Sequence, residues 1–394
     1  MIATAERVHL TRAALVAIGA VFFLMGILAS AYGPLLGYLS HRFGISLAIA
    51  GGTLSAHLLG ALVGVLVSMR ALQSVASRSF MLGALSLLGL GCVGVALAPS
   101  WGAFLGAVLV IGVGFGALDI GCNQLVAHSA GAGRTAVLNV LNGAFGFGAV
   151  AGPLLVSTVG RTHLSLLYGG AAAVAVGVLP LVAGISGRLP FTAQRTPARS
   201  NALVGIFMVA FALYVGIETG TGGWMPSHLE SIGLQSLAAA TLTSGFWLAL
   251  AVGRLLAGFL PARVPEPTTV IVGTAVAALA LLVALNHAAA PVAYIVAGLA
   301  IAPIFPTGIV WLAKLRPGDA RATSWLFPAS MVGGAIIPGG IGAVIARFGI
   351  AWAPAVLSLV AVGCLVAFSI AARGIGGRIG KGSTALVRGD RERQ

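Results

Sequence analysis

Long apolar runs are the feature that most limits what this chain can fold into. Twelve runs of about 20 residues or more follow one another, and a helix of that length crosses the hydrocarbon layer of a bilayer. Charged residues make up only 8% of the 394 residues, against roughly 25% in soluble domains. We therefore expect an all-α membrane protein with twelve transmembrane helices at about 13–39, 46–69, 79–98, 101–127, 136–159, 163–186, 202–226, 236–260, 268–287, 290–313, 324–346 and 351–372.

The placement of basic residues gives an expected orientation. Cytoplasmic loops of membrane proteins are enriched in Lys and Arg. If the N-terminus is cytoplasmic, only Arg42, Arg161 and Arg347 of the 22 Lys and Arg residues lie on the outer side. The formal net charge of +14 then follows from topology and does not indicate a nucleic-acid partner. We expect a multi-pass protein of a bacterial-type inner (plasma) membrane, with both termini in the cytoplasm.

A polar segment divides the chain after the sixth apolar run. The stretch "SGRLPFTAQRTPARSN" contains Pro, Ser and three Arg, and "GAVAGP" before it has a counterpart, "GGAIIP", in the corresponding run after it. Such a pattern is typical of two parallel six-helix repeats, the two halves of the major facilitator fold. The expected units are an N-terminal bundle at 1–186, a cytoplasmic linker at 187–201, a C-terminal bundle at 202–372 and a basic cytoplasmic tail at 373–394.

Two of the eight acidic residues, Asp119 and Glu218, lie inside apolar runs. A charge at the bilayer centre costs at least about 2.5 kcal/mol, so such residues face a cavity and are functional by default. Asp119 and Asn142 are about equally far from the hairpin turn between their runs, so both should lie near the midplane. We predict that Asp119 binds substrate or carries protons, with Asn123, Asn139 and Asn142 as substrate-binding amides. A purely structural polar cluster is the alternative.

Further candidates lie in four other runs. Four glycines and a proline in "YVGIETGTGGWMPSHL" predict a broken helix, where Glu218 could bind hydroxyls, carry a proton, gate the outer side or cap the break. Trp224 and Trp247 could stack on a substrate ring, although Trp224 could equally lie at the membrane interface. His57 could relay protons or form an interhelical hydrogen bond. The prolines of "PIFPTG" at 303–308 predict a kink or hinge.

The sequence holds no nucleotide-binding loop and no nucleophile with its base. Its three cysteines, Cys92, Cys122 and Cys364, lie in apolar runs without metal-ligand spacing. We therefore expect no enzymatic activity, no catalytic residue, no metal and no cofactor. The expected partners are a small-molecule substrate, protons and the lipid bilayer, with no nucleic acid, and the expected state is a monomer.

Five segments resemble the fucose/glucose–galactose branch of the major facilitator superfamily. They are "GFGALDIGCNQLV", "LNVLNGAFGFGAVAGPLL", "GIETGTGGW", "FWLALAVGRLLAG" and "APIFPTG". The resemblance implies alternating access and often proton-coupled sugar uptake, with Asp119 near the sugar and Asn123 and Asn139 in its polar lining. Proton-coupled members can carry a second acid in the first helix, where this chain has Gly33. Coupling would then rest on Asp119, on Glu218, or be absent.

The function expected from these features is secondary active transport of a small polar solute, with a sugar as the first choice and proton symport through Asp119 or Glu218. Asparagine both donates and accepts hydrogen bonds, which suits hydroxyl groups. A proton-driven exporter of drugs or metabolites is the alternative. "GFGAVAGP" partly resembles an antiporter motif, but Leu154, Leu155 and Val156 replace the glycines expected after its proline.

Overall fold

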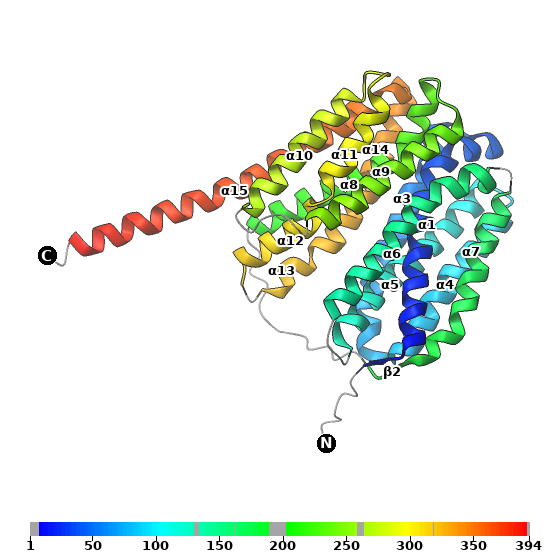
Figure 1. The fold of residues 1–394 in the computed structure, drawn as a ribbon, viewed down its shortest axis with the longest axis horizontal. Helices are drawn as coiled ribbons and strands as arrows, with labels where there is room; N and C mark the ends of the chain where they lie inside the picture. Colours follow the sequence, from blue (N-terminus) through cyan, green and yellow to red (C-terminus); the bar gives the residue numbers. More distant parts are fainter. Residues whose placement is uncertain are drawn as a thin grey trace.

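The described part of the chain is a bundle of membrane-length helices. A computed structural model describes residues 8–129, 134–161, 163–188, 202–257, 264–317 and 319–391. Within them, twelve segments are long and apolar enough to cross a membrane, and their limits agree with the predicted runs to within a few residues. The prediction of an all-α, multi-pass membrane fold is therefore confirmed (Figure 1).

Several of the twelve spans contain more than one helical element. The first six spans are built from α1 (Arg12–Phe43), α2 (Leu47–Ala50), α3 (Gly52–Ser74), α4 (Ser77–Leu97), α5 (Trp101–His128), α6 (Arg134–Leu155), the π-helical turn η1 (Val156–Gly160), α7 (Leu164–Val178) and the 3₁₀ helix η2 (Leu179–Gly184). The last six are built from α8 (Ala202–Ser231), α9 (Ser236–Ala257), α10 (Glu266–Val283), α11 (Ala290–Ile301), α12 (Ile304–Leu315), α13 (Ala320–Ser324), α14 (Leu326–Phe348), the 3₁₀ turn η3 (Ile350–Trp352) and α15 (Ala353–Arg391).

These helices form two groups, which we call the N-terminal bundle (α1 to η2) and the C-terminal bundle (α8 to α15). In the first group α3 packs on α5 and α1 on α6, and in the second α8 packs on α14 and α15. The groups meet through three main helix pairs, α1 with α8, α3 with α14, and α6 with α9. Figure 1 shows them side by side. The linker boundaries remain a prediction, because residues 189–201 lie outside the described residues.

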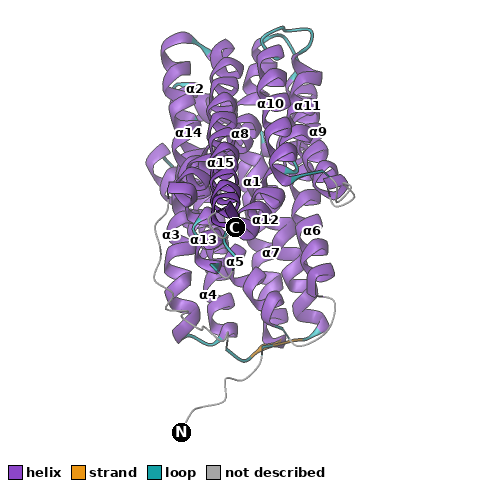
Figure 2. Ribbon diagram, turned by 90° about the vertical axis from the view of Figure 1, so that its left-hand side faces the viewer, coloured by secondary structure: helices purple, strands orange, loops and turns teal. Residues whose placement is uncertain are grey.

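Two short strands mark one end of the molecule. Strand β1 (His9–Leu10) pairs antiparallel with β2 (Ile185–Ser186), which joins the start of the first span to the end of the sixth (Figure 2). We call this the terminal end, and we call the opposite end, where α1 meets α2, the distal end. The cytoplasmic position of the terminal end remains a prediction from the charge pattern.

Glycines let helix backbones touch within and between spans. A side chain on Gly60 of α3 would lie 2.2 Å from the carbonyl oxygen of Leu109 on α5. One on Gly148 of α6 would lie 2.0 Å from the carbonyl oxygen of Phe23 on α1. Small residues at such contacts allow the dispersion and backbone interactions that hold membrane helices together. Close packing therefore accounts for glycines that sequence alone could assign to flexibility.

The predicted break in the helix around Glu218 is wrong. Helix α8 runs unbroken from Ala202 to Ser231, with Pro226 inside it. Its glycines serve packing instead, because a Cβ on Gly222 would lie 2.6 Å from the Trp247 ring and one on Gly223 would lie 2.3 Å from the Leu54 side chain. The Trp247 and Leu54 side chains fill the space beside these two glycines, so the glycines serve packing within a continuous helix.

The predicted interruption at the prolines of the tenth span is confirmed. Helix α11 ends at Ile301 and α12 begins at Ile304, with Pro303 between them. The last membrane-length span, Ile350–Arg373, agrees with the predicted 351–372. Helix α15 itself continues beyond this span to Arg391 (Figure 1).

Candidate functional site

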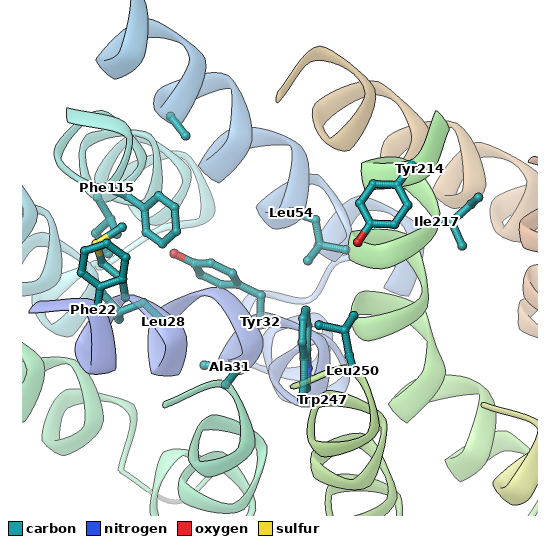
Figure 3. Close-up of a cluster of buried hydrophobic side chains, with 14 of the residues drawn as sticks. Phe22, Leu28, Ala31, Tyr32, Leu54, Phe115, Tyr214, Ile217, Trp247 and Leu250 are labelled. Carbon is teal, nitrogen blue, oxygen red and sulfur yellow. The ribbon is translucent and has the colours of Figure 1, made fainter. Parts of the chain in front are cut away.

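A cavity of about 120 Å³ lies where the two bundles meet. Residues of α1, α3, α5 and α6 form one wall, and residues of α8 and α9 form the other. Figure 3 shows Tyr32 and Phe115 of the first wall facing Trp247 of the second, with Leu54 nearby. Glu218 and Trp247 lie near the middles of α8 and α9, so the cavity lies near the centre of the membrane-spanning bundle.

Glu218 lines this cavity and carries two partners from its own bundle. Its Oε2 atom accepts a hydrogen bond from the Tyr214 hydroxyl at 2.5 Å and forms an ion pair with Arg254 Nη2 at 2.9 Å. The same nitrogen donates to the Tyr214 oxygen at 3.2 Å. The Glu218 side chain is 14% exposed and that of Arg254 is 35% exposed. The guanidinium thus balances the charge of the one acidic side chain among the lining residues.

His57 also lines the cavity, from the opposite wall. The Tyr32 hydroxyl on α1 lies 3.1 Å from His57 Nδ1 on α3, so the interhelical hydrogen bond weighed from the sequence exists. The imidazole also meets the Phe115 ring edge-on, with ring centroids 4.8 Å apart. His57 is 3% exposed, and its Nε2 atom has no hydrogen-bond partner among the described residues.

The two tryptophan candidates have different positions. Trp247 lines the cavity, is 6% exposed, and its Nε1–H finds no partner within the described part of the chain. Trp224 is fully buried, and its Nε1–H donates to the carbonyl oxygen of Pro338 at 3.1 Å. The Trp224 ring packs on Gly51 and Gly342, away from the residues that line the cavity. It is not among the residues that line the cavity, and its hydrogen bond joins α8 to α14.

Asp119 and Asn123 form a pair on α5, outside the cavity lining. Asp119 Oδ1 accepts a hydrogen bond from Asn123 Nδ2 at 3.1 Å, and both side chains are half-buried. They lie on the terminal side of Phe115, one and two turns along α5. Among the described residues, no basic side chain forms an ion pair with Asp119. Gly116, on the same helix, packs on the carbonyl oxygen of Ala61 in α3.

The remaining amide candidates do not join this pair in the described contacts. Asn142 is exposed, and its amide donates to the carbonyl oxygen of Leu138 on its own helix at 2.8 Å. Asn139 belongs to α6, but its side chain is not among those that the structure describes. In the described residues, no group of three His, Cys, Asp or Glu side chains is arranged to hold a metal ion.

An ion pair that the sequence did not reveal closes the distal side of the cavity. Arg161, just after η1, pairs with Glu230 of α8 at 2.6 Å and donates from Nη2 to the carbonyl oxygen of Pro34 at 3.1 Å. It also donates to the Ser236 hydroxyl at the start of α9. Arg161 and Glu230 come from different bundles, so this cluster ties the bundles together at the distal end. The charge pattern placed Arg161 among the three basic residues expected on the outer side, but it did not pair Arg161 with Glu230.

Backbone contact reinforces this closure beside the cavity. A Cβ on Gly33 of α1 would lie 2.3 Å from the carbonyl oxygen of Gly222 and 2.9 Å from that of Gly223 on α8. All three glycines line the cavity. At this height the two bundles therefore touch without side chains between them.

Comparison of sequences finds relatives that are named as transporters. Residues 18–204 match the family model described as Major Facilitator Superfamily. The chain is 27% identical over 144 residues to the glucose/mannose transporter GlcP of Bacillus subtilis (strain 168), a match that covers 35% of each chain. It is 24% identical over 281 residues to the sodium-dependent glucose transporter 1 of Danio rerio. That match covers 59% of this chain and 47% of the relative, so the similarity spans about a third to a half of these relatives' length.

Solved structures extend the similarity to almost the whole chain. The structure of a D-xylose–proton symporter superposes with a TM-score of 0.78 at 14% identity, covering 90% of this chain and 96% of that one. A peptide transporter, POT, crystallised with alafosfalin, gives the same TM-score at 16% identity, covering 93% and 95%. At these identities the likeness shows the fold alone. The two solved structures are named for different solutes, D-xylose in one and peptides in the other.

Proposed function

We propose that this chain is a transporter of the major facilitator superfamily and that it moves a small hydroxylated solute, with a hexose as the substrate. The observation that carries the proposal is the central cavity, where Glu218, His57 and Trp247 present polar groups from both bundles. The two curated relatives are named as transporters of glucose or mannose, which favours a sugar among the possible solutes.

The lining of the cavity suits a molecule with several hydroxyl groups. A solute that leaves water loses its hydrogen bonds and crosses only if protein groups replace them. Glu218 can accept a hydrogen bond and Trp247 Nε1 can donate one. The Thr219 hydroxyl, which donates to the Val215 carbonyl oxygen, can accept one. The aromatic rings of Phe115 and Trp247 offer apolar surface for the carbon face of a sugar ring.

The proposed mechanism is alternating access. The Arg161–Glu230 pair holds the bundles together on the distal side of the cavity, and Gly33 contacts Gly222 beside the cavity. We propose that this arrangement is the state open toward the terminal end, and that breaking the Arg161–Glu230 pair accompanies opening of the distal end. By the charge pattern, the terminal end faces the cytoplasm of a bacterial-type inner membrane.

Proton symport is assigned in this proposal to Asp119. Among the described residues its carboxylate has an amide partner and no cation, so a proton can bind there without leaving a positive charge unpaired. Neutralising that carboxyl lowers the cost of moving it through an occluded state. Proton and sugar then favour the same conformational change, because each binds one state better than the other. Asn123 and Asn139 are proposed as polar neighbours of this carboxyl.

Counterflow in proteoliposomes tests the proposal. Vesicles loaded with D-glucose or D-mannose and diluted into labelled sugar should take up label, whereas protein-free vesicles should not. Sugar-evoked current should increase when the outer solution is made acidic, since a proton would enter with each sugar. Counterflow without any pH-dependent current would leave sugar transport standing and remove proton symport. No counterflow with any hexose would contradict the proposed substrate class.

A further inference from the structure

We propose that His57 and Trp247 are two substrate-binding donors, one from each bundle, and that Tyr32 is the positioning residue that makes His57 a donor. The inference rests on the proposed transport of a hydroxylated solute and names the side chains that hold it. It replaces the proton-relay role considered for His57 and adds Tyr32, which the sequence did not single out.

The first observation is a pair of buried nitrogen atoms without partners. His57 is 3% exposed and Trp247 is 6% exposed, and both rings line the same cavity. Buried side-chain polar atoms nearly always have a hydrogen-bond partner in native proteins. Within the described residues, His57 Nε2 and Trp247 Nε1 have none. Two such atoms on one cavity are explained if a ligand supplies the missing partners.

The second observation concerns the direction of these hydrogen bonds. Trp247 Nε1–H can only donate. A neutral imidazole has one donor and one acceptor nitrogen, and the hydrogen bond made by one nitrogen decides the role of the other. The Tyr32 hydroxyl lies 3.1 Å from His57 Nδ1, and we take this hydroxyl as the donor, which places the ring proton on Nε2. His57 Nε2 is then a donor as well.

Tyr32 is held firmly enough to impose this choice. It is 1% exposed, and its ring lies 5.1 Å from the His57 ring between centroids. Figure 3 shows the Tyr32 hydroxyl turned toward Phe115. Phe115 also packs on His57, so two aromatic rings contact the imidazole.

The two donors come from opposite walls, which decides the kind of solute that fits. His57 belongs to α3 and Trp247 to α9, so a molecule bound by both must present acceptor oxygens on two sides. Glu218 on α8 supplies an acceptor for a hydroxyl proton. A neutral pyranose, with oxygens around the whole ring, meets all three requirements. Because both bundles contact the solute, its binding affinity depends on how the bundles are arranged relative to each other.

Deoxy and deoxyfluoro sugars distinguish donors from acceptors in the protein. Fluorine accepts a hydrogen bond but cannot donate one, whereas hydrogen at the same carbon does neither. We would measure the Kd of the purified full chain for D-glucose and for its complete deoxy and deoxyfluoro series. At two positions the deoxy sugar should bind about tenfold more weakly while the fluoro sugar binds nearly as well as glucose. At the position that meets Glu218, both analogues should bind weakly.

Variants then assign each position to its side chain. Trp247→Phe should abolish the difference between glucose and the deoxy sugar at one position only. Tyr32→Phe frees His57 to place its proton on Nδ1, so at the second position the fluoro sugar should become as weak as the deoxy sugar. Tyr38→Phe is the matched control, because Tyr38 is on the same helix and its hydroxyl accepts from Arg42 away from the cavity. It should leave the whole series unchanged.

Three results would overturn the inference, and they differ from one another. Fluoro sugars that bind as weakly as deoxy sugars at every position would remove both donors, and this comparison needs no variant. Unchanged profiles in folded Trp247→Phe and Tyr32→Phe proteins would remove the assignment while leaving sugar transport intact. Failure of every hexose to bind would remove the proposed function itself and this site with it.

Discussion

Glu218 and Asp119 are both acids inside membrane-spanning helices, but their surroundings differ. Glu218 lines the central cavity and is paired with Arg254 and Tyr214. Asp119 lies outside the lining, and its described side-chain partner is the neutral amide of Asn123. Proton uptake by Glu218 would leave the charge of Arg254 unbalanced, whereas proton uptake by Asp119 leaves no cation unbalanced among the described residues. The partners that a buried group already has therefore limit what else it can do.

The same rule separates the two tryptophans. The Trp224 N–H donates to the carbonyl of Pro338, whereas the Trp247 N–H has no partner among the described residues. We expect polar atoms without partners to bind the solute, and side chains whose polar atoms are all paired to act on stability or conformation. The experiments below challenge that distinction, beginning with the largest expected effect.

Glu218→Gln should reduce sugar transport by about 30-fold, or roughly 2 kcal/mol, because a charged hydrogen bond to the solute and the balance of Arg254 are both lost. Initial rates of counterflow would measure it. The double variant Glu218→Gln/Arg254→Gln separates the two contributions, since it removes the stranded cation. Recovery of normal transport in that protein would mean that Glu218 only balances Arg254.

Asp119→Asn should abolish accumulation while sparing exchange. With one proton per sugar, a gradient of one pH unit supports about tenfold accumulation, and the variant should reach a ratio of about one. Steady-state uptake in vesicles with an imposed pH gradient is the measurement. Asp319→Asn is the matched control, because that acid pairs with Arg316 outside the membrane-length helices. Accumulation that persists in Asp119→Asn would transfer the coupling role to another residue.

Arg161→Gln should weaken the distal closure and open that end more often. A loss of 1–2 kcal/mol shifts a two-state equilibrium by roughly 5–30-fold. A cysteine introduced by Gly37→Cys would report the change, since this position lies 3.9 Å from Arg161 Nη2 and the native cysteines are buried.

The rate of labelling by a membrane-impermeant thiol reagent should rise by that factor in Arg161→Gln. Lys314→Gln breaks an exposed ion pair with Glu266 elsewhere in the C-terminal bundle and should leave the rate unchanged. Equal labelling with and without Arg161 would show that the ion pair does not hold the distal end closed.

Trp224→Phe should have the smallest effect. Loss of one hydrogen bond costs about 1 kcal/mol, so the midpoint of thermal unfolding should fall by roughly 2–4 °C while sugar affinity stays the same. Trp247→Phe should show the reverse, with weaker binding and little change in thermal stability. A drop in affinity for Trp224→Phe equal to that of Trp247→Phe would erase the distinction between partnered and unpartnered groups.

Membrane crossing was predictable because it depends on about 20 consecutive residues, and an apolar run such as 101–127 can be recognised from those residues alone. Glu218 could be chosen as a candidate functional residue in the same way, since a charge in the bilayer is costly wherever its partner lies. The pairing itself was not predictable, because Arg254 is brought to Glu218 by the packing of α9 on α8.

Other features depend on rotation about a helix axis, which sequence does not fix. Trp224 and Trp247 both lie in apolar runs, and only the structure shows which one faces the cavity. Tyr32 reads as an ordinary packing residue until its hydroxyl is placed beside His57. Glycines are ambiguous for a related reason. Those before Trp224 suggested a broken helix, but a glycine that accommodates a neighbouring ring and one that loosens a backbone look alike in sequence.

The contact of Gly33 with Gly222 and Gly223 bears on how fast the bundles can exchange conformations. Interlocked side chains must disengage before two helices can tilt, and each such step adds to the activation barrier. Here the carbonyl oxygens of α8 meet a backbone without a side chain. Such a contact can act as a pivot about which α1 and α8 tilt relative to each other with a low activation barrier. Because the pivot borders the cavity, a small rotation displaces the distant helix ends most and the bound solute least.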